Sequence, residues 1–515
     1  MSLQYTPIED LPNVVDALNR TFLDGVTKPL NYRKEQLRRL YDLLDENEVA
    51  LVKCLYDDLR KPEIEVIGGE IAAVKEDILF FLKNLDKLSK PEKVKPRYLV
   101  NAVDKLQVRH VPLGLVLIMG AWNYPVNLLL LPFVGAIAAG NTVILKPSEI
   151  AVHTAATITS LLPRYLDERS YRIVNGGVPE TTRLLEYRFD HIFYTGNGNV
   201  GRIVMTAAAK HLTPVTLELG GKTPVIIAPD ADLQVTANRV VWGKLYNCGQ
   251  TCIAADYVLI PEAQLEPFLD AIRRTIDDFF GADPQKSDSY GRIVSDHHFT
   301  RLFNMIDRTS GRIILGGQHD KAERYIAPTV ITGIDENDPL LHDEIFGPIL
   351  PVVAVKDVDA AVEYVNAKWI GLFNIQKGRD TPLALYLFAK SSRTISKVLD
   401  NTRSGGVLVN DTLMHYQELS LPFGGVGPSG MGNYHGVKSW QTFTHERATM
   451  IKDQSLEVVQ KAVKYPPYTQ QKLQIVRFLT ISVPWFKRGR AYKTAVRLLA
   501  GIVVLLAILA ASKRK

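Results

Sequence analysis

Hydrophobic residues recur with helical spacing over residues 8–95. The stretch RKEQLRRLYDLLDENEVALVKCLYDDL, for example, repeats apolar positions three or four residues apart, which gives a helix one apolar face. Pro91 and Pro96 end this pattern. The segment VDKLQVRHV that follows alternates polar and apolar residues, as an exposed strand does. The N-terminal part is therefore predicted to be helical, followed by a strand-forming arm at residues 97–111.

From Leu113 the pattern changes to short apolar runs that are bounded by turn residues. The runs LGLVLIMG, NTVILKPS, YRIVNG, HIFYTG and PVIIAPD are separated by helical stretches. After about residue 212 a second set follows: VTLELGG, YVLIPE, GRIILGG, YIAPTVI, ILPVVAV, LALYLFA and GGVLVN. Strands that alternate with helices predict an α/β fold with mostly parallel sheets, covered on both faces.

Composition and charge narrow the class of protein. The chain has 515 residues, 46% of them hydrophobic, and three cysteines, too few for a disulfide framework. The net charge of +6 is uneven, because residues 458–515 hold twelve Lys or Arg and no Asp or Glu. The rest of the chain is mildly acidic and shows no basic stripe with aromatic residues, so we expect no nucleic-acid partner.

The basic C-terminal region contains one long apolar run. Residues 498–512 read LLAGIVVLLAILAAS and are flanked by Arg497 and by a final KRK. Such a run is shorter than a typical span, but snorkelling Lys and Arg lengthen it. We predict a C-terminal transmembrane anchor that contacts membrane lipid. The preceding basic segment, 446–497, is either a solvated linker or includes an interfacial helix.

Two turns at strand ends suggest nucleotide binding. FYTGNGNVGRIV spells G-x-G-x-x-G through Gly196, Gly198 and Gly201, after a strand and into a helix, where backbone N–H groups can hold a pyrophosphate. A plain strand–helix turn explains it equally well. In LKPSE, Lys146 and Glu149 are placed to hold ribose hydroxyls, or simply form an exposed turn.

Reactive side chains gather in four further motifs. Glu218 lies in an apolar strand, where a carboxylate has a raised pKa or a partner. NCGQTC holds Cys248 and Cys252, which form a metal pair, a disulfide, or one nucleophile beside a bystander. The Cys-x3-Cys spacing lacks a second ligand pair for a metal. Asn123 in WNYP offers a donor to an oxyanion, and HDEIFGP adds an acid and an aromatic residue.

Other candidates are interpreted as structural. Cys54 lies among the apolar positions of a helix and is expected to be buried. His297 and His298 are expected on a solvated helix. Residues 367–381 form an unusual loop, either a surface insertion or an element of the substrate or cofactor entrance.

Taken in order, WNYP, KPSE, FYTGN-x-x-VG, LELGGK, GQTC, EIFGP and PFGGVGPSGMG resemble the aldehyde dehydrogenase superfamily, over residues 122–432. The wording NYPVNLLLLP, GQTCIAADY and HDEIFGPILPV looks like the class 3 branch. With its apolar C-terminus, the chain is most similar to membrane-bound fatty aldehyde dehydrogenases.

The resemblance implies a mechanism. Cys252 would attack the aldehyde, Asn123 and the Cys252 N–H would hold the oxyanion, hydride would pass to the nicotinamide, and Glu218 would activate water to hydrolyse the thioester. The implied substrates are long-chain aliphatic aldehydes, since tethering at a membrane places the enzyme where such molecules concentrate. Cys248 is then the bystander, although its sulfur would affect sensitivity to oxidation.

The resemblance also implies a cofactor and its binding residues. NAD is expected, with NADP as an alternative, because Glu149 should repel a 2′-phosphate. The cofactor-binding residues implied are Lys146, Glu149, Gly196, Asn197, Gly198, Asn199, Val200, Gly201, Glu344 and Phe346, and no metal is expected.

The resemblance implies a domain organisation and an assembly. Residues 1–96 and 112–211 would form a Rossmann-like NAD-binding domain and 212–423 an α/β catalytic domain. A small β bridging or oligomerisation element would comprise 97–111 and 424–445, in a homodimer. The tail would anchor a cytosolic body, at the endoplasmic reticulum by resemblance, or at the mitochondrial outer membrane or peroxisomes.

Two other functions fit the same residues. A cysteine-dependent thioesterase or esterase would use Cys252 and Glu218 without redox chemistry. A catalytically inactive, membrane-tethered scaffold would keep the fold alone, although the intact Asn123, Glu218 and Cys252 speak against it.

Overall fold

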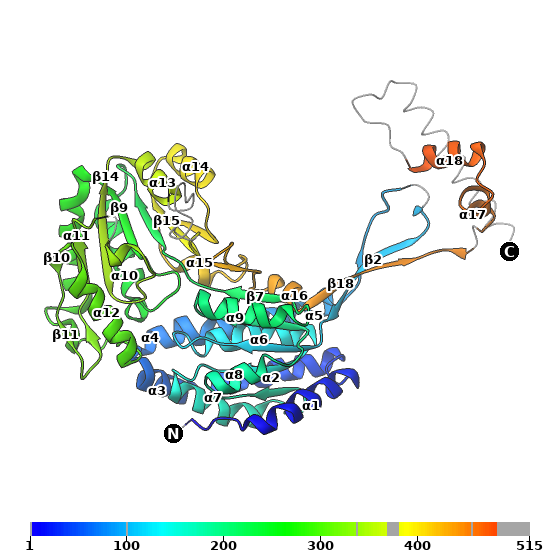
Figure 1. Ribbon diagram of the computed structural model, residues 1–515, viewed down its shortest axis with the longest axis horizontal. Helices are drawn as coiled ribbons and strands as arrows, with labels where there is room; N and C mark the ends of the chain where they lie inside the picture. Colours follow the sequence, from blue (N-terminus) through cyan, green and yellow to red (C-terminus); the bar gives the residue numbers. More distant parts are fainter. Residues whose placement is uncertain (1–2, 99–100, 336–337, 368–380, 455–456, 481–515) are drawn as a thin grey trace. The chain divides into compact units, whose positions relative to one another are not determined.

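The computed structural model describes residues 3–98, 101–335, 338–367, 381–454 and 457–480. The chain divides into two compact units (Figure 1). Unit 1 comprises Met1–Asp86 and Pro112–Thr444, and unit 2 comprises Lys87–Val111 and His445–Lys515. The predicted apolar anchor at 498–512 and the loop core at 368–380 lie outside the described residues.

The first sheet of unit 1 has six strands in the order β17-β7-β6-β3-β4-β5. They are β3 (Leu115–Met119), β4 (Thr142–Lys146), β5 (Tyr171–Ile173), β6 (His191–Thr195), β7 (Val215–Glu218) and β17 (Gly430–Met431). All pair in parallel except β17, which runs antiparallel to β7. The predicted parallel α/β pattern is confirmed here.

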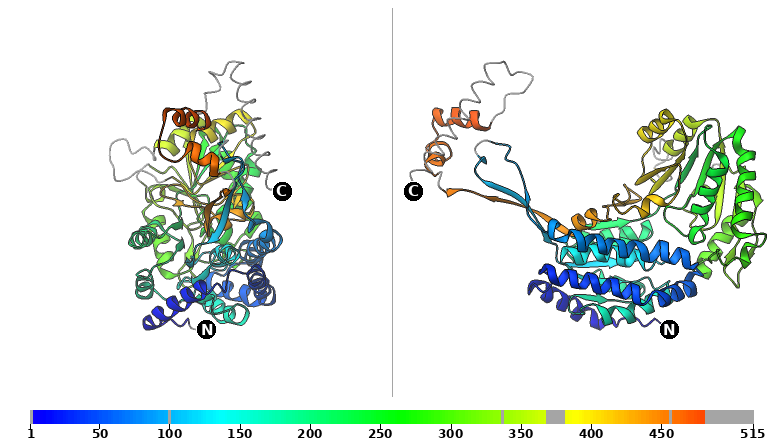
Figure 2. Two further views of the ribbon diagram at one scale, coloured as in Figure 1. Left: turned by 90° about the vertical axis from the view of Figure 1, so that its right-hand side faces the viewer. Right: turned by 180° about the vertical axis from the view of Figure 1, so that it is seen from behind.

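Helices cover both faces of this sheet (Figures 1 and 2). The helices of this region are α1 (Leu11–Leu23), α2 (Leu30–Glu46), α3 (Glu48–Leu59), α4 (Glu63–Val66), α5 (Ala72–Leu88), α6 (Asn127–Ala139), α7 (Val152–Tyr165), α8 (Val178–Leu184) and α9 (Gly198–Ala209). Alternate strand residues face opposite sides, so Leu115 and Leu117 pack against Leu18 of α1 and Val204 of α9. The other face packs on α6, whose residues are all buried.

The second sheet of unit 1 has seven strands in the order β10-β13-β14-β9-β8-β15-β16. They are β8 (Pro224–Ile227), β9 (Tyr257–Pro261), β10 (Arg312–Leu315), β13 (Thr329–Thr332), β14 (Ile349–Val355), β15 (Ala384–Phe388) and β16 (Gly406–Val409). The helices of this region are α10 (Leu233–Leu245), α11 (Leu265–Phe280), α12 (Asp296–Arg308), α13 (Val358–Ala367), α14 (Ser392–Asn401) and α15 (Met414–Gln417). A short hairpin, β11 (His319–Asp320) with β12 (Tyr325–Ile326), lies beside it.

The crossing between the two sheets lies later than the predicted boundary at residue 212. β7 pairs with β6 in the first sheet, with Thr195 opposite Glu218, whereas β8 pairs with β9 and β15 in the second. The runs VTLELGG and PVIIAPD therefore belong to the opposite sheets from those expected. Both runs are equally apolar, so their strand partners, and not their composition, decide the sheet to which each belongs.

The described part of unit 2 contains a three-stranded sheet and two helices. Its strands are β1 (Glu92–Lys93), β2 (Lys105–Pro112) and β18 (Thr444–Ile451), with β2 in the centre. The alternating run VDKLQVRHV is thus confirmed as a strand. As far as residue 480, the basic segment 446–497, predicted as a linker or an interfacial helix, forms part of β18, α17 (Glu457–Val463) and α18 (Gln470–Thr480).

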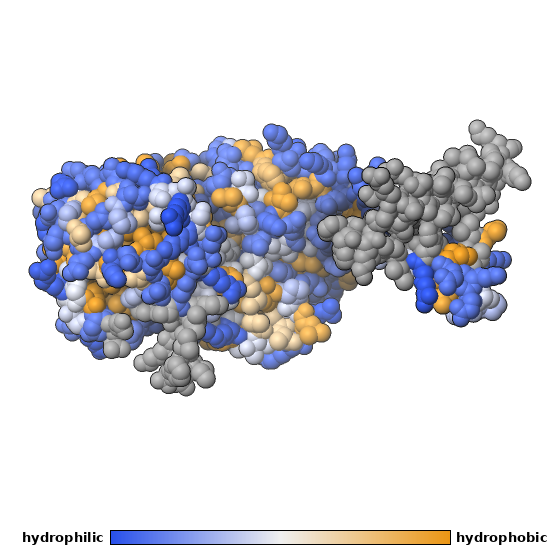
Figure 3. All heavy atoms as spheres, turned by 90° about the horizontal axis from the view of Figure 1, so that it is seen from above, coloured by the Kyte–Doolittle hydropathy of each residue, from blue (hydrophilic) through white to orange (hydrophobic). Residues whose placement is uncertain are grey.

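The segment 424–445, predicted to belong with the arm, is divided between elements. β17 pairs with β7, and α16 (Val437–Thr442) packs against α6 within unit 1, while β18 begins at Thr444. Among the described residues, no helix is both long and apolar enough to span a bilayer. The described surface seen in Figure 3 is largely hydrophilic, with smaller hydrophobic groups scattered over it.

Candidate active site

The predicted nucleophile lies in a tight loop after α10. Residues Tyr246–Gly249 form a 3-10 turn in which Asn247 and Cys248 have φ of 53° and 55°. Left-handed backbone is unfavourable for non-glycine residues and persists where the surroundings hold it in place. Gly249 continues the turn with φ of 75°, and a Cβ there would stand 2.3 Å from the carbonyl oxygen of Gly347. The loop therefore has little freedom to move, and it carries Cys252.

The two cysteines of this loop differ in environment. Cys252 is partly exposed, whereas Cys248 is buried. Burial raises the pKa of the Cys248 thiol to about 12. Burial, and then the charges of Glu344 and Glu218, raise the pKa of Cys252 as well, while the backbone N–H groups of Cys252 and Ile253 act to lower it. Only Cys252 reaches the pocket described below.

Glu218 is the last residue of β7 and is almost completely buried. Neither of its carboxyl oxygens has a hydrogen-bond partner among the described residues. Burial raises its pKa well above the ordinary value. A carboxyl group held in this way favours its neutral form more than an exposed one does, and it is suited to exchanging protons with a molecule that enters the pocket.

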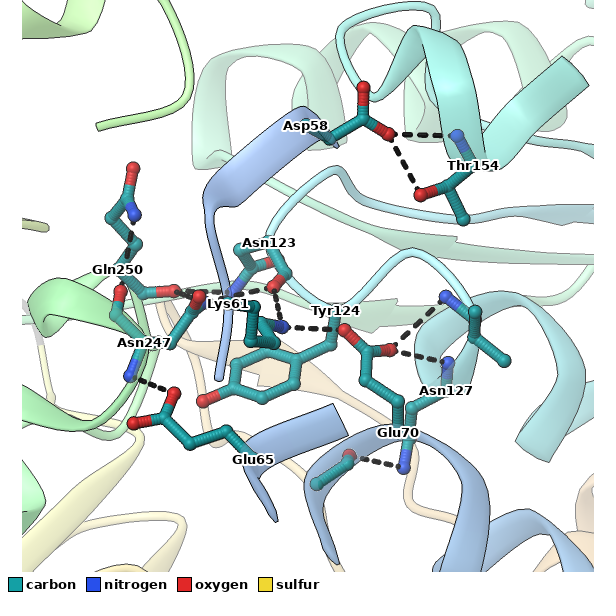
Figure 4. Close-up of polar contacts among 12 residues, drawn as sticks. Asp58, Lys61, Glu65, Glu70, Asn123, Tyr124, Asn127, Thr154, Asn247 and Gln250 are labelled. Carbon is teal, nitrogen blue, oxygen red and sulfur yellow. Dashed lines mark hydrogen bonds and ion pairs between the residues drawn. The ribbon is translucent and has the colours of Figure 1, made fainter. Parts of the chain in front are cut away.

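Asn123 lies against the cysteine loop (Figure 4). Its side-chain Nδ2 donates a hydrogen bond to the Gln250 carbonyl at 3.0 Å. Its own carbonyl accepts one from Asn247 Nδ2 at 2.9 Å. Tyr124 and Thr251 join their hydroxyl groups at 2.7 Å. These three bonds attach Asn123, the predicted oxyanion donor, and its neighbour Tyr124 to the loop that carries Cys252. The Asn123 Nδ2 group retains a second hydrogen.

The HDEIFGP segment is held from several sides. Asp256 accepts hydrogen bonds from the Ile345 N–H at 3.1 and 3.3 Å, and Lys222 Nζ donates to the Asp343 carbonyl at 3.0 Å. Glu344 is directed at the backbone of Gly220, where a Cβ would stand 2.2 Å from its Oε2. Burial raises the pKa of Glu344, and its Oε1 has no hydrogen-bond partner among the described residues.

Phe346 belongs to an aromatic group that was only partly predicted. It has φ of 53°, and its ring lies 5.3 Å from that of Trp122, edge to face. Trp122 in turn lies 4.8 Å from the imidazole of His298. His298 is therefore not a solvated helix residue, as the sequence suggested. Burial lowers its pKa to about 4, so the ring is neutral at physiological pH.

The predicted ribose residues lie at the carboxyl end of β4. Lys146 Nζ donates to Glu149 Oε2 at 2.9 Å and to the Pro147 carbonyl at 3.2 Å. Lys146 is buried, while Glu149 is partly exposed and open to a ligand. In a parallel sheet, ligands bind outside the carboxyl ends of the strands, which is the position of this pair.

The predicted pyrophosphate turn joins β6 to α9. Asn197 is the N-cap of α9 and accepts a hydrogen bond from Val200 N–H, with Asn199 exposed beside it. A Cβ on Gly196 would stand 2.2 Å from Tyr194 Oη, and one on Gly201 would stand 2.9 Å from Leu219, so a side chain at either position would have to displace its neighbour. At Gly198 a Cβ would meet only Arg202 Nη1, at 3.5 Å. The middle glycine of the motif therefore has no steric role here.

These groups fit a nicotinamide dinucleotide. The partly exposed Glu149 beside Lys146 offers an acceptor and a donor to a ribose, and the start of α9 offers N–H groups to phosphate. Glu344 Oε1, which is buried and has no hydrogen-bond partner in the described part of the chain, is an acceptor that a second ribose would satisfy. Among the described residues, no cluster of three His, Cys, Asp or Glu side chains is arranged to hold a metal ion.

Cys252 and Glu218 line one pocket in unit 1. Its walls come from several elements that are far apart in the sequence. Most of the lining residues are aromatic or aliphatic. They include Gly68, Gly69, Tyr124, Trp242, Tyr246, Leu413, Tyr416, Phe423 and Tyr434. The arrangement brings a thiol and a proton-accepting carboxyl group together in apolar surroundings.

Several residues of the site had no signal in the sequence. Lys61, Glu65 and Glu70 are buried polar residues that contact the Asn123 and cysteine segments, yet they lie in a stretch of the sequence that reads as ordinary amphipathic helix. Their position in the fold alone reveals them. By contrast, Cys54 is buried, as predicted, and bonds only to the Leu51 carbonyl within its helix.

A cysteine beside a buried carboxyl group and a dinucleotide-type sheet define a cysteine-dependent α/β enzyme. Residues 4–449 match the model of the aldehyde dehydrogenase family. The chain is 46% identical to mouse aldehyde dehydrogenase family 3 member A2, over 92% of this chain and 94% of that one. It is 44% identical to the mouse "aldehyde dehydrogenase, dimeric NADP-preferring", over 89% and 98%. The substrate-bound structure of Staphylococcus aureus AldH superimposes with a TM-score of 0.86, at 37% identity over 91% of this chain and 99% of that one.

The chain belongs to the aldehyde dehydrogenase family, in its class 3 branch. The expected activity, oxidation of aldehydes to carboxylic acids, and the expected cofactor, NAD with NADP as an alternative, are confirmed at the level of the family. The branch that the motifs suggested is confirmed as well.

Proposed function

We propose that this protein oxidises long-chain aliphatic aldehydes to carboxylic acids, with NAD as its preferred cofactor. The observation that carries the proposal is the apolar pocket around Cys252 and Glu218. Each methylene of an aliphatic chain gains about 0.8 kcal/mol on leaving water. A pocket with aromatic and aliphatic walls therefore favours longer chains over short, soluble aldehydes.

Cys252 begins the reaction. Its Sγ attacks the aldehyde carbonyl carbon, a C–S bond forms, and the carbonyl oxygen becomes an oxyanion. Cys252 reacts as its thiolate, the thiol proton having passed to solvent. The second Nδ2 hydrogen of Asn123 and the Cys252 N–H stabilise the oxyanion, which typically contributes about 10²–10³ in rate for each donor.

Bound NAD(P) supplies the acceptor for the hydride of the thiohemiacetal carbon. Lys146, Glu149 and the Gly196–Gly201 turn would hold the cofactor, with Glu344 and Phe346 towards its nicotinamide end. Glu149 would repel a 2′-phosphate, which supports the preference for NAD. Glu218 then takes a proton from water, the water oxygen bonds to the thioester carbon, and the C–S bond breaks. The carboxylic acid leaves, Cys252 returns to its thiolate form, and Glu218 releases its proton to solvent.

We also propose a location, from the sequence, and an assembly, from a relative and from the sheet of unit 2. The apolar run at 498–512, between basic residues, would anchor a cytosolic body to membrane lipid, most simply at the endoplasmic reticulum. The name of one mouse relative describes that protein as dimeric. In this chain, β18 is an edge strand of the unit 2 sheet, where pairing with a second copy is favoured. We therefore propose a homodimer.

NADH formation tests the function. Hexadecanal and NAD are added to the enzyme in detergent, absorbance is followed at 340 nm, and Cys252→Ala and Cys248→Ala are compared with wild type. NADH from wild type and Cys248→Ala, but not from Cys252→Ala, is the expected result. Acid release from a thioester without any NADH from an aldehyde would instead identify a hydrolase, and inactivity in both assays would leave a scaffold.

A further inference from the structure

A buried ion pair lies directly behind Asn123 (Figure 4). Lys61 Nζ and Glu70 Oε1 are 2.5 Å apart, and both side chains are fully buried. Lys61 Nζ also donates a hydrogen bond to the Asn123 carbonyl at 2.9 Å and lies 4.1 Å from the centre of the Tyr124 ring. The ammonium group thus contacts both residues at the centre of the WNYP motif.

Glu70 fixes the other side of the same segment. Its Oε2 accepts hydrogen bonds from the N–H groups of Val126 and Asn127, at 3.1 and 3.0 Å. These N–H groups lie at the start of α6, where backbone N–H groups have no partner within the helix. The Glu70 carboxylate therefore holds the backbone just after Asn123 directly. Through Lys61 it also holds the backbone carbonyl of Asn123.

A π-helical turn places Glu70 in this position. Residues Ile67–Ile71 form the turn, which connects α4 to α5, and such turns are frequent at functional sites. The same short stretch presents Gly68 and Gly69 to the pocket. Glu65, five residues before Glu70, accepts the N–H of Asn247 at 2.8 Å. This segment thus contacts both the Asn123 chain and the cysteine loop.

The placement of the Asn123 amide depends on these contacts. Its Nδ2 must reach the oxyanion that forms on a carbonyl bound to Cys252, and a small misplacement weakens such a contact steeply. A lone buried charge is unfavourable, so the two charges stabilise each other only as a pair. We propose that Lys61 and Glu70 are a positioning pair for the oxyanion donor Asn123. This inference rests on the proposed role of Asn123.

The test compares two buried carboxylates that cap helices. In Lys61→Met/Glu70→Gln both charges are removed together, so that neither remains unpaired. Asp58→Asn is the matched control: Asp58 is buried and accepts the N–H groups of His153 and Thr154 at the start of α7, at 3.0 and 2.8 Å, away from Asn123 (Figure 4). Thermal unfolding and the alkylated fraction of Cys252 give the amount of folded enzyme.

Single-turnover NADH formation is then measured for each variant. We expect the Lys61→Met/Glu70→Gln rate per folded enzyme to fall about 10- to 100-fold, with KM for NAD unchanged, and the Asp58→Asn rate to stay close to wild type. In an Asn123→Ala background the same pair of changes should lower the rate less than about twofold, because effects exerted through one residue are not additive.

The outcomes separate this inference from the proposed function. A wild-type rate in the double variant, or an equal loss with and without Asn123→Ala, would overturn the positioning role while leaving the dehydrogenase intact. Full activity of Asn123→Ala would overturn both the role of Asn123 and this inference. If the double variant does not fold, Lys61→Arg replaces it: the ion pair remains, the donor to Asn123 moves, and an undiminished rate in that variant contradicts the proposal.

Discussion

The carboxyl group of Glu344 lies against the backbone of Gly220, two residues after Glu218. A Cβ on Gly220 would stand only 2.2 Å from Glu344 Oε2. Glu344, the proposed cofactor contact, therefore lies directly against the segment that follows Glu218, the proposed base. A side chain at position 220 has to displace either the Glu344 carboxyl group or this segment.

Gly220→Ala should for this reason reduce activity without unfolding the protein. We expect kcat/KM for NAD to fall about tenfold or more, because the carboxyl group of Glu344 is displaced from its position. Steady-state kinetics with varied NAD measure this. Gly177→Ala is the control, since a Cβ there meets nothing closer than 3.6 Å. Equal kinetics in the two variants would contradict the proposed importance of the contact.

Glu218→Gln should change the pH profile of turnover. Burial raises the pKa of Glu218, so the carboxylate that accepts protons forms only as pH rises. We expect kcat of wild type to increase as pH rises through the raised pKa of Glu218. The variant should lose this rising limb and accumulate the thioester, detectable as a burst of NADH without turnover. A rising limb that survives in the variant would assign it to another group.

The same raised pKa predicts an effect on stability. The unfolded chain ionises Glu218 near its ordinary value, while the folded protein keeps the proton, so the free energy of unfolding falls as pH rises between the two pKa values. The loss is about 1.4 kcal/mol per pH unit in that window. Glu218→Gln should remove it. Urea unfolding of both proteins at pH 5 and pH 8 is the measurement, and the variant should gain relative stability at pH 8 only.

Cys248 should be insensitive to peroxide. It is buried, and burial raises the pKa of its thiol to about 12, whereas the thiolate is the form that oxidises. The influence on oxidation that the sequence suggested is therefore not expected. Cys248→Ser and wild type should be inactivated by hydrogen peroxide at the same rate, with cofactor-bound enzyme as a control for protection of Cys252. Slower inactivation of the variant would restore the first hypothesis.

Glu149→Gln should weaken the preference for NAD. The partly exposed Glu149, beside Lys146, carries the negative charge that would repel a 2′-phosphate, and Lys146 would then face the phosphate alone. We expect the ratio of kcat/KM for NAD to that for NADP to fall about tenfold or more, which corresponds to about 1.4 kcal/mol. An unchanged ratio would place the selectivity elsewhere.

The sequence predicted the local elements well. Runs such as TVILK and HIFYT are apolar on both faces and form the central strands β4 and β6, because buried parallel strands require it. The turn around Asn197 was also predictable, since a capping side chain at the start of a helix is a property of a short segment, whereas the packing of Gly201 on Leu219 needs the tertiary structure. The candidate residues Cys252, Glu218 and Asn123 were proposed from their motifs, and the structure places Cys252 and Glu218 in one pocket.

The sequence alone could not decide relations between distant segments. VTLE and PVII are equally apolar, and only hydrogen bonding to β6 or β9 assigns them to different sheets. The sequence predicted His298 on a solvated helix, whereas in the structure its imidazole packs against Trp122. Lys61 and Glu70 resemble any charged residues on an amphipathic segment, and their burial behind Asn123 arises from the packing of several elements.

The sequence by itself thus determined which segments form strands and helices and which side chains can react. These properties follow from periodicity and from residue chemistry over a few neighbouring positions. Tertiary structure decided which carboxyl groups are buried, which thiol reaches the pocket and what holds Asn123 in place. Burial and long-range hydrogen bonds depend on residues that are distant in the chain, and they set the pKa values and geometry on which the chemistry depends.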